Sequence, residues 1–127
     1  MVTGIPGRVW YFTSFGTVYV ADDPITTGPH INSPQIARGQ GIYITTSLDG
    51  INSFFSYSIV FTNREYNGST LLIQGRLIQL SNEGELAIVG GTGKFRFATG
   101  FATLELTYFH AATFYSVQQC NITILHY

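Results

Sequence analysis

The glycine cluster of residues 90–94, GGTGK, comes closest among the motifs of this chain to a phosphate-binding loop. A Walker-type loop needs Gly-x-x-x-x-Gly-Lys-Ser/Thr between a strand and a helix, because its backbone N–H groups surround the phosphate and its hydroxyl contacts magnesium. Here Ile88 stands in place of the first glycine, and Phe95 follows Lys94 where the hydroxyl is needed. The dinucleotide fingerprint fails as well, since Arg96 occupies the position of its last glycine. The cluster therefore does not predict a nucleotide site.

The same cluster predicts a turn that leads into a long strand. Glycine adopts positive φ without steric penalty, so we expect Gly90, Gly91 and Gly93 to form the turn, some of them with φ > 0. Aromatic and β-branched side chains then alternate, which is typical of a strand and not of a helix. The residues expected on one face of this strand are Phe95, Phe97, Thr99, Phe101 and Thr103.

Other catalytic or metal-binding patterns are weak. The histidines His30, His110 and His126 do not have the spacing of a zinc site, and a single cysteine excludes an intrachain disulfide. The apolar neighbours of Cys120 predict a buried thiol that packs as a small hydrophobic group. The sequence order shows no Ser-His-Asp or Cys-His constellation. We therefore expect no metal and no cofactor.

Charged side chains offer a few candidates for binding or acid–base chemistry. Asp22 and Asp23 precede Pro24 at the end of a predicted strand, where carboxylates commonly cap turns, and the alternative is that one of them is a pocket acid. Arg38 lies in a segment that is otherwise poor in charge, so it either pairs with one of these aspartates or binds a ligand oxygen. Arg76 has the same two alternatives, and Lys94 is either a solvated turn residue or a cation that binds a ligand.

Length and composition indicate one globular domain. A chain of 127 residues can bury its own core, and 45% hydrophobic with 10% charged residues excludes disorder. The net charge of −1 leaves no basic surface for a nucleic acid. No apolar run reaches the roughly 18 to 20 residues of a membrane-spanning helix, and residues 1–14 lack the apolar region of a signal peptide.

Nearly every segment between turns has the composition and alternation of a β-strand. In residues 52–63, for example, alternation predicts one bulky face, made by Phe55, Tyr57, Ile59 and Phe61. Pro24 is expected to end the first strand, and Asn67-Gly68 predicts a hairpin turn. Regular strand spacing with glycine turns predicts a single all-β barrel or sandwich with meander connections. A barrel of about eight strands has room for one small ligand, bound at its mouth. The predicted strands are residues 15–23, 37–48, 52–63, 70–80 and 112–127, together with the stretch 87–106, in which the glycine turn precedes the long strand that starts at Phe95.

Five blocks of the sequence, in unbroken order, resemble the plant dirigent proteins. They are FGTVYVADDPITTGP, ARGQGIYI, FFSYSIVFTNREYNGSTL, AIVGGTGKFRFATGFA and the terminal ILHY. The resemblance covers Gly4 to Tyr127 and implies that residues 1–127 form a single eight-stranded antiparallel β-barrel domain that assembles as a homotrimer. The family usually has a further strand before the matching region, so we expect the first family strand to be missing from this chain, as a truncation or a natural short form.

The resemblance also implies site residues. Tyr57 matches a pocket tyrosine whose phenol can donate a hydrogen bond or stack on a ring; the alternative is an aromatic of the barrel wall without a ligand. Lys94 and Thr99 stand where lignan-forming members have an aspartate and an arginine, which removes the usual acid and its cationic partner. With Phe97 from the same block, they are candidate ligand-binding positions. Tyr57, Asp22 and Asp23 are then the candidate catalytic residues.

Two functions follow from the resemblance. In the first, the protein binds phenolic radicals from a separate oxidase, or a quinone methide, and directs selective coupling or cyclisation in lignan or phenylpropanoid metabolism and plant defence. In the second, it is a non-catalytic defence module that binds a saccharide or a phenolic. The resemblance implies secretion to the apoplast, with the cytoplasm as the alternative. No oxidising centre, nucleic acid or membrane is expected in either case.

Overall fold

The computed structural model describes residues 14–30, 32–78, 84–110, 112 and 115–125, with backbone only for a few of these. Their secondary structure is seven β-strands and one short 3₁₀ turn, so the all-β prediction is confirmed. The elements are β1 (Val18–Thr26), β2 (Gln35–Thr45), β3 (Asn52–Phe61), β4 (Thr70–Ile78), β5 (Gly84–Thr92), η1 (Gly93–Phe95), β6 (Thr99–His110) and β7 (Tyr115–Leu125).

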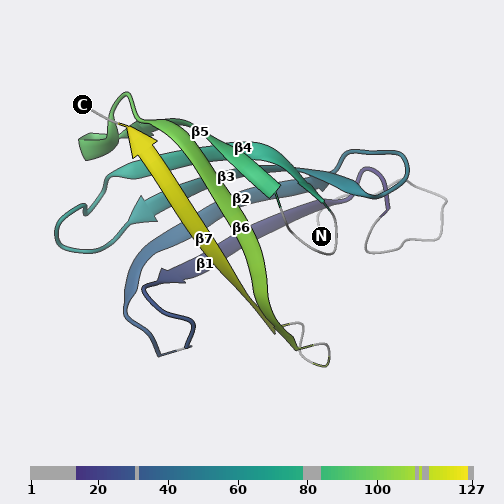
Figure 1. Ribbon diagram of the computed structural model, residues 1–127, viewed down its shortest axis with the longest axis horizontal. Coiled ribbons are helices and arrows are strands. Elements are labelled where there is room, and N and C mark those ends of the chain that lie inside the picture. The colour runs from purple at the N-terminus through teal and green to yellow at the C-terminus, as the bar shows by residue number, and fades with distance from the viewer. Residues whose placement is uncertain (1–13, 31, 79–83, 111, 113–114, 126–127) are drawn as a thin grey trace.

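The seven strands form one antiparallel sheet in the order β1-β2-β3-β4-β5-β6-β7, so each strand pairs with its neighbours in the sequence. The meander connections predicted from the turns are therefore present. The sheet curls into a half-barrel, with β6 and β7 running steeply across the direction of β1 to β3 (Figure 1). The described residues thus contain seven of the eight strands expected for the barrel.

One face of the sheet, here called the inner face, carries the core. On β4 the buried Leu71, Ile73 and Leu77 alternate with exposed residues, as a strand with one covered face requires. Leu86 and Ile88 continue this face on β5. The rest of the buried cluster comes from β2, β3, β6, η1 and the residues between η1 and β6, and comprises Ala37, Ile59, Phe95, Ala98 and Ala102. On β3 the inner face includes Phe55, Tyr57, Ile59 and Phe61, the set predicted from alternation.

The expected turn and strand around GGTGK differ from the observed structure. Gly90 and Gly91 lie within β5, and of the three glycines only Gly93 has positive φ, at 64°. A 3₁₀ turn follows and buries Phe95 against Phe61 and Tyr66, with ring centroids 5.1 Å apart in each pair. Because burying this ring requires a sharp turn, the strand predicted to run from Phe95 begins four residues later, at β6.

Two further expectations are corrected. The first strand does not stop at Pro24: β1 continues to Thr26, with Pro24 opposite Arg38. β1 is an edge strand of the described sheet, and proline is tolerated at an edge because its missing N–H costs no ladder bond there. Cys120 is exposed and not buried, because β7 ends the described sheet and pairs only with β6. Desolvation by nearby atoms still raises the pKa of its thiol.

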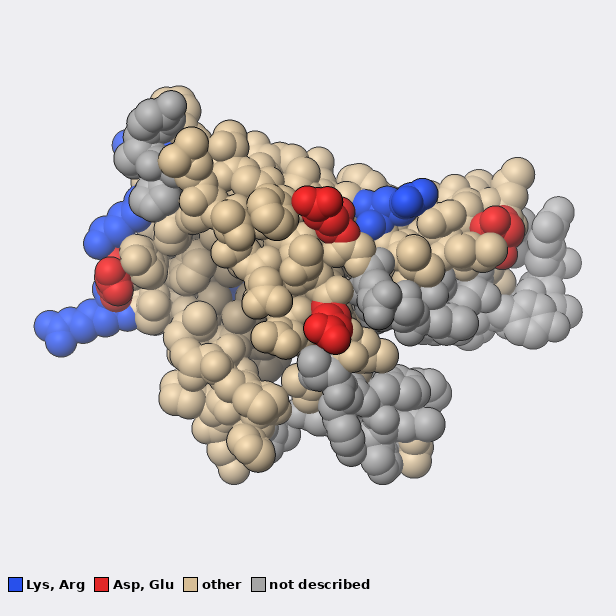
Figure 2. All heavy atoms as spheres, viewed as in Figure 1, with Lys and Arg blue, Asp and Glu red and all other residues tan. Residues whose placement is uncertain are grey.

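Uncharged side chains dominate the surface seen in Figure 2, where the few acidic and basic groups are scattered. Within the described part of the chain, no helix is long and apolar enough to cross a membrane. The same residues contain no group of three or more His, Cys, Asp or Glu side chains that could hold a metal ion.

Candidate functional site

Strands β1, β2 and β3 place polar and aromatic side chains side by side on the inner face. Their register puts Asp23 opposite Gly39, and Gly41 opposite Tyr57. Since side chains alternate between faces, Asp23 and Tyr57 share the inner face with the buried Ile59. Between them, Gly39 and Gly41 carry no side chain on β2. A group on β3 can therefore reach a group on β1 by crossing the middle strand.

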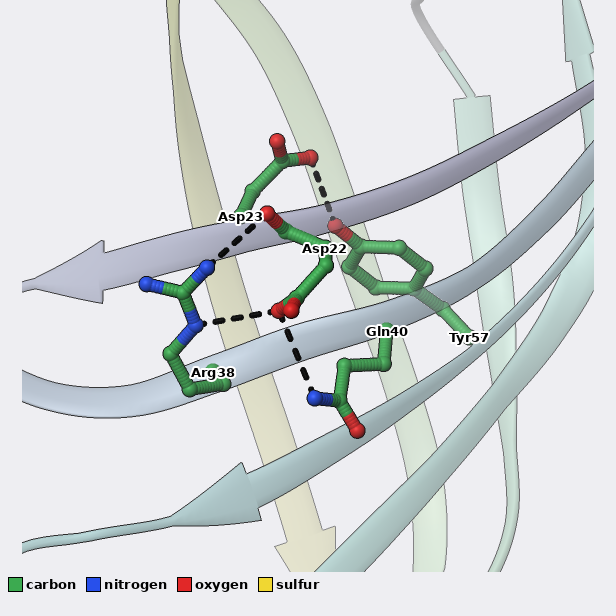
Figure 3. A network of polar contacts seen from close by, with 5 residues as sticks. All are labelled: Asp22, Asp23, Arg38, Gln40 and Tyr57. Atoms are coloured by element: carbon green, nitrogen blue, oxygen red, sulfur yellow. Dashed lines mark hydrogen bonds and ion pairs between the residues drawn. The ribbon is translucent and has the colours of Figure 1, made fainter. Parts of the chain in front are cut away.

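Tyr57 and Asp23 make this contact. The Tyr57 hydroxyl donates a hydrogen bond of 2.8 Å to Asp23 Oδ2, across 34 residues of sequence (Figure 3). Burial of the phenol, followed by the hydrogen bond to Asp23 and the negative charge of Asp23, raises the pKa of Tyr57 far above its usual value. The phenol therefore stays protonated at physiological pH and can act as a hydrogen-bond donor.

Aromatic rings flank this pair on the same face. Tyr19 stacks on Tyr43 with ring centroids 4.7 Å apart and an interplanar angle of 12°. The ring centroids of Phe55 and Tyr57 are also 4.7 Å apart, and these two rings are tilted by 35°. Burial, with smaller contributions from Tyr19 and the charge of Asp23, raises the pKa of Tyr43 to about 12. We call the set Tyr19, Tyr43, Phe55 and Tyr57 the aromatic surface. It offers flat rings and protonated phenols to a ligand.

Asp22 belongs to a different network, on the opposite, outer face of β1. Arg38 Nε donates to Asp22 Oδ1 at 3.0 Å, and Arg38 Nη2 donates to the backbone carbonyl of Asp22 at 2.9 Å. Gln40 Nε2 donates to the same carboxylate at 3.3 Å (Figure 3). The hydrogen bond from Arg38 is the main reason that the pKa of Asp22 is lowered. The predicted pairing of Arg38 with one of the two aspartates is therefore confirmed.

The other candidate residues lie elsewhere. Arg76 is exposed on the outer face of β4, opposite Phe54. Lys94 lies in η1 and contacts the turn between β3 and β4. Its Nζ donates to the Glu65 carbonyl at 2.8 Å and lies 5.8 Å from the centre of the Tyr66 ring. Phe97 is 77% exposed after η1, with φ of 64°, and Thr99 is exposed at the start of β6. The roles of Arg76, Lys94, Phe97 and Thr99 in ligand binding stay predictions.

Sequence reasoning missed Tyr19 and Tyr43. The available signal was the alternation in VYVADD and GIYITT, which places Tyr19 on the same face as Asp23 and Tyr43 on the same face as Gly41. What alternation cannot supply is the pairing register of β1, β2 and β3, which brings these rings beside Tyr57 and Asp23. The observed site suits an aromatic ligand that carries hydroxyl or carbonyl oxygens.

Comparison with known proteins points to one family. Residues 1–125 match the model for dirigent-like proteins. Dirigent protein 11 of Arabidopsis thaliana is 40% identical over 125 residues, which cover 98% of this chain and 64% of that protein. Pterocarpan synthase 1 of Glycine max is 42% identical over 104 residues, which cover 81% of this chain and 52% of that protein. The chain thus spans about half to two thirds of the length of these curated relatives.

Solved structures agree with the sequence comparison. The pterocarpan synthase dirigent protein PsPTS1 superposes with a TM-score of 0.85 at 36% identity, covering 99% of this chain and 82% of that one. The pterocarpan synthase dirigent protein GePTS1 gives a TM-score of 0.83, also at 36% identity, covering 94% of this chain and 75% of that one. Fold, family model and relatives all lead to the same conclusion: the chain belongs to the dirigent-like protein family.

Proposed function

We propose that this protein binds a phenolic quinone methide, or phenolic radicals, on the aromatic surface and directs the bond that the ligand then forms. Its pterocarpan synthase relatives support a dirigent-type role in phenylpropanoid metabolism. The observation that carries the proposal is the hydrogen bond from Tyr57 to Asp23 beside the stacked rings of Tyr19 and Tyr43 and the tilted ring of Phe55. It combines a fixed carboxylate with rings on which a phenolic ligand can stack.

For a quinone methide, Asp23 would act as the proton carrier. A ligand hydroxyl attacks the electrophilic methide carbon and gives its proton to the Asp23 carboxylate, while the displaced π electrons move to the quinone oxygen. That oxygen becomes a phenolate and takes a proton from water, and Asp23 returns the proton it accepted to water, so the net reaction is an isomerisation without an oxidant. Tyr57 keeps the carboxylate in place through its 2.8 Å hydrogen bond. The aromatic surface selects which face of the methide carbon is attacked.

For radical coupling, the protein would supply geometry alone. A separate oxidase generates the phenoxy radicals, and two radicals combine with no proton transfer in the bond-forming step. A tenfold preference between two coupling faces requires only about 1.4 kcal/mol, which is the size of one good hydrogen bond. Tyr57 is the side chain best placed to provide it by accepting a hydrogen bond from a ligand hydroxyl, because its own O–H donates to Asp23 and its oxygen keeps a free lone pair.

The two adjacent aspartates provide a matched test. We expect Tyr57→Phe and Asp23→Asn to remove most of the enantiomeric excess of the product, whereas Asp22→Asn, on the outer face, should leave it unchanged. Chiral chromatography measures the product, from coniferyl alcohol with an oxidase in one assay and from a benzylic alcohol that dehydrates to a quinone methide in the other. Equal losses for Asp22→Asn and Asp23→Asn would contradict the assigned faces.

Saccharide binding is the alternative, favoured by the Tyr19–Tyr43 stack, since sugar rings also pack on aromatic faces. It is the function to keep if the parent protein yields racemic products in both assays while a saccharide raises its melting temperature. Secretion to the apoplast, a separate oxidase as partner, a defence role and assembly as a homotrimer also remain proposals, supported by the family resemblance.

A further inference from the structure

We infer that Gly39 is a positioning residue: its missing side chain is what allows Tyr57 to lie across β2 and place its hydroxyl on Asp23. The inference concerns the position of the phenol. Its consequence for product selectivity rests on the function proposed above.

The geometry around Gly39 is specific. A Cβ atom on Gly39 would collide with Cε1 of Tyr57 and would lie 2.8 Å from Cζ and 2.9 Å from the hydroxyl oxygen. These are the atoms at the far end of the ring, next to the hydrogen bond with Asp23. Asp23 is in turn the residue opposite Gly39 in the β1–β2 ladder. The ring therefore occupies the space that any other residue at position 39 would fill.

Gly41 plays a different part, although it lies two residues away on the same face. A Cβ on Gly41 would collide with the backbone carbonyl of Ser56 and would lie 2.8 Å from Tyr57 Cα. Backbone atoms cannot move aside as a side chain can, so Gly41 is required for the approach of β2 and β3. Substitution of Gly41 would disturb the fold and could not isolate the position of the phenol.

Gly39→Ala should act selectively, because the atoms in its way belong to the free end of one side chain. Rotation about the Cβ–Cγ bond would leave Cζ and the hydroxyl oxygen in place, because both lie on that axis. The collision is therefore relieved by a change of χ1, which swings the whole Tyr57 ring and carries the hydroxyl away from Asp23. Glycine within a strand costs stability in its own right, which indicates that position 39 retains it for space and not for backbone conformation. Gly90 provides the control, since it also lies in a strand and a Cβ there would meet nothing within 4 Å.

The first test observes Tyr57 directly. Protein labelled with ¹³Cζ-tyrosine is titrated by NMR, and the Tyr57 signal is assigned from its loss in Tyr57→Phe. In Gly39→Ala we expect the signal to shift and the pKa of Tyr57 to fall toward its ordinary value, because the bond to Asp23 is one of the causes that raise it. Gly90→Ala should reproduce the parent titration. An unchanged Tyr57 signal in folded Gly39→Ala would overturn the inference.

The second test remains decisive if Gly39→Ala folds poorly. We expect Gly39→Ala to lower the melting temperature of the parent, and to have no such effect in a Tyr57→Ala background, where the ring is absent. Equal losses in both backgrounds would mean that position 39 contacts something other than Tyr57 and would refute the assignment.

The functional consequence can be separated from the function itself. If Tyr57→Phe reduces selectivity, Gly39→Ala should reduce it to the same level, and the double variant should show no further loss. Full selectivity in Gly39→Ala would count against the inference alone. If Tyr57→Phe has no effect on selectivity, the proposed function fails, and the NMR titration still decides whether Gly39 positions the phenol.

Discussion

At the level of single residues, strand alternation assigns different chemistry to two neighbouring carboxylates. Asp22 faces outward to Arg38 and Gln40 and is held by three hydrogen bonds that involve its side chain or carbonyl. Asp23 faces inward and accepts one hydrogen bond, from a half-buried phenol. Water and salt weaken an exposed pair such as Asp22 and Arg38, so we assign it a local structural role. The inward carboxylate is the one placed among the aromatic side chains.

A pH-dependent stability follows from Tyr43. Its pKa is about 12 in the folded protein, against 10.0 for an ordinary tyrosine, because burial disfavours the tyrosinate. The resulting contribution to folding is therefore complete below pH of about 10 and is lost as the pH rises toward 12. We expect the urea midpoint to fall across this window, and to fall less in Tyr43→Phe. Parallel pH profiles for parent and variant would contradict this assignment.

At the level of elements, the sequence predicted well those strands in which local pattern and tertiary environment agree. In β3 the alternation correctly placed Phe55, Tyr57, Ile59 and Phe61 on one face, and Asn67-Gly68 correctly predicted the β3–β4 turn, where Gly68 has φ of 83°. The failures have physical causes that a local pattern does not contain. Whether a strand can continue through Pro24 depends on whether β1 is an edge strand. Where β6 starts depends on the burial of Phe95 in the preceding turn.

The aromatic cluster at η1 gives a stability prediction. Phe95 is buried and contacts both Phe61 and Tyr66, whereas Phe97, two residues later, is 77% exposed. We expect Phe95→Ala to lower the free energy of unfolding by about 3 to 5 kcal/mol, the usual cost of removing a buried ring. The matched variant Phe97→Ala should change it by less than about 0.5 kcal/mol. Urea denaturation measures both, and similar losses at the two positions would disprove the assigned burial.

At the level of the whole molecule, the candidate site is a property of three strands together. Tyr57 and Asp23 are 34 residues apart, and their contact needs the register of β1 on β2 and of β2 on β3. The family resemblance predicted Tyr57 as a site residue, and the chemistry of carboxylates predicted Asp22 or Asp23. Neither could choose between the two aspartates, because the assumed strand end at Pro24 left their faces undefined. The predicted burial of Cys120 is wrong for a similar reason. The local sequence does not show that β7 ends the described sheet, where the Cys120 side chain is exposed.

Exposed apolar side chains on the outside of the sheet point to assembly of several chains. Several apolar residues on the outer face or in the β5 bulge are exposed in the single chain: Val20, Phe54, Leu72, Val89 and Phe101. We propose that a homotrimer covers part of this apolar surface. Light scattering at micromolar concentration should give about three times the chain mass of 14.0 kDa. A monodisperse 14.0 kDa species would exclude the trimer under those conditions.

The strict sequence order of the strands has a consequence for how the chain reaches its fold. Because every described strand pairs only with the preceding and following strand, each new ladder closes a short loop and loses little chain entropy. Native contacts are therefore closer in sequence than in a Greek-key sandwich, and such topologies fold faster at equal stability. The sheet can grow hairpin by hairpin from any nucleus. The Tyr57 hydroxyl can reach Asp23 only after both the β1–β2 and the β2–β3 hairpins have formed. The site is therefore completed after the individual hairpins of these three strands.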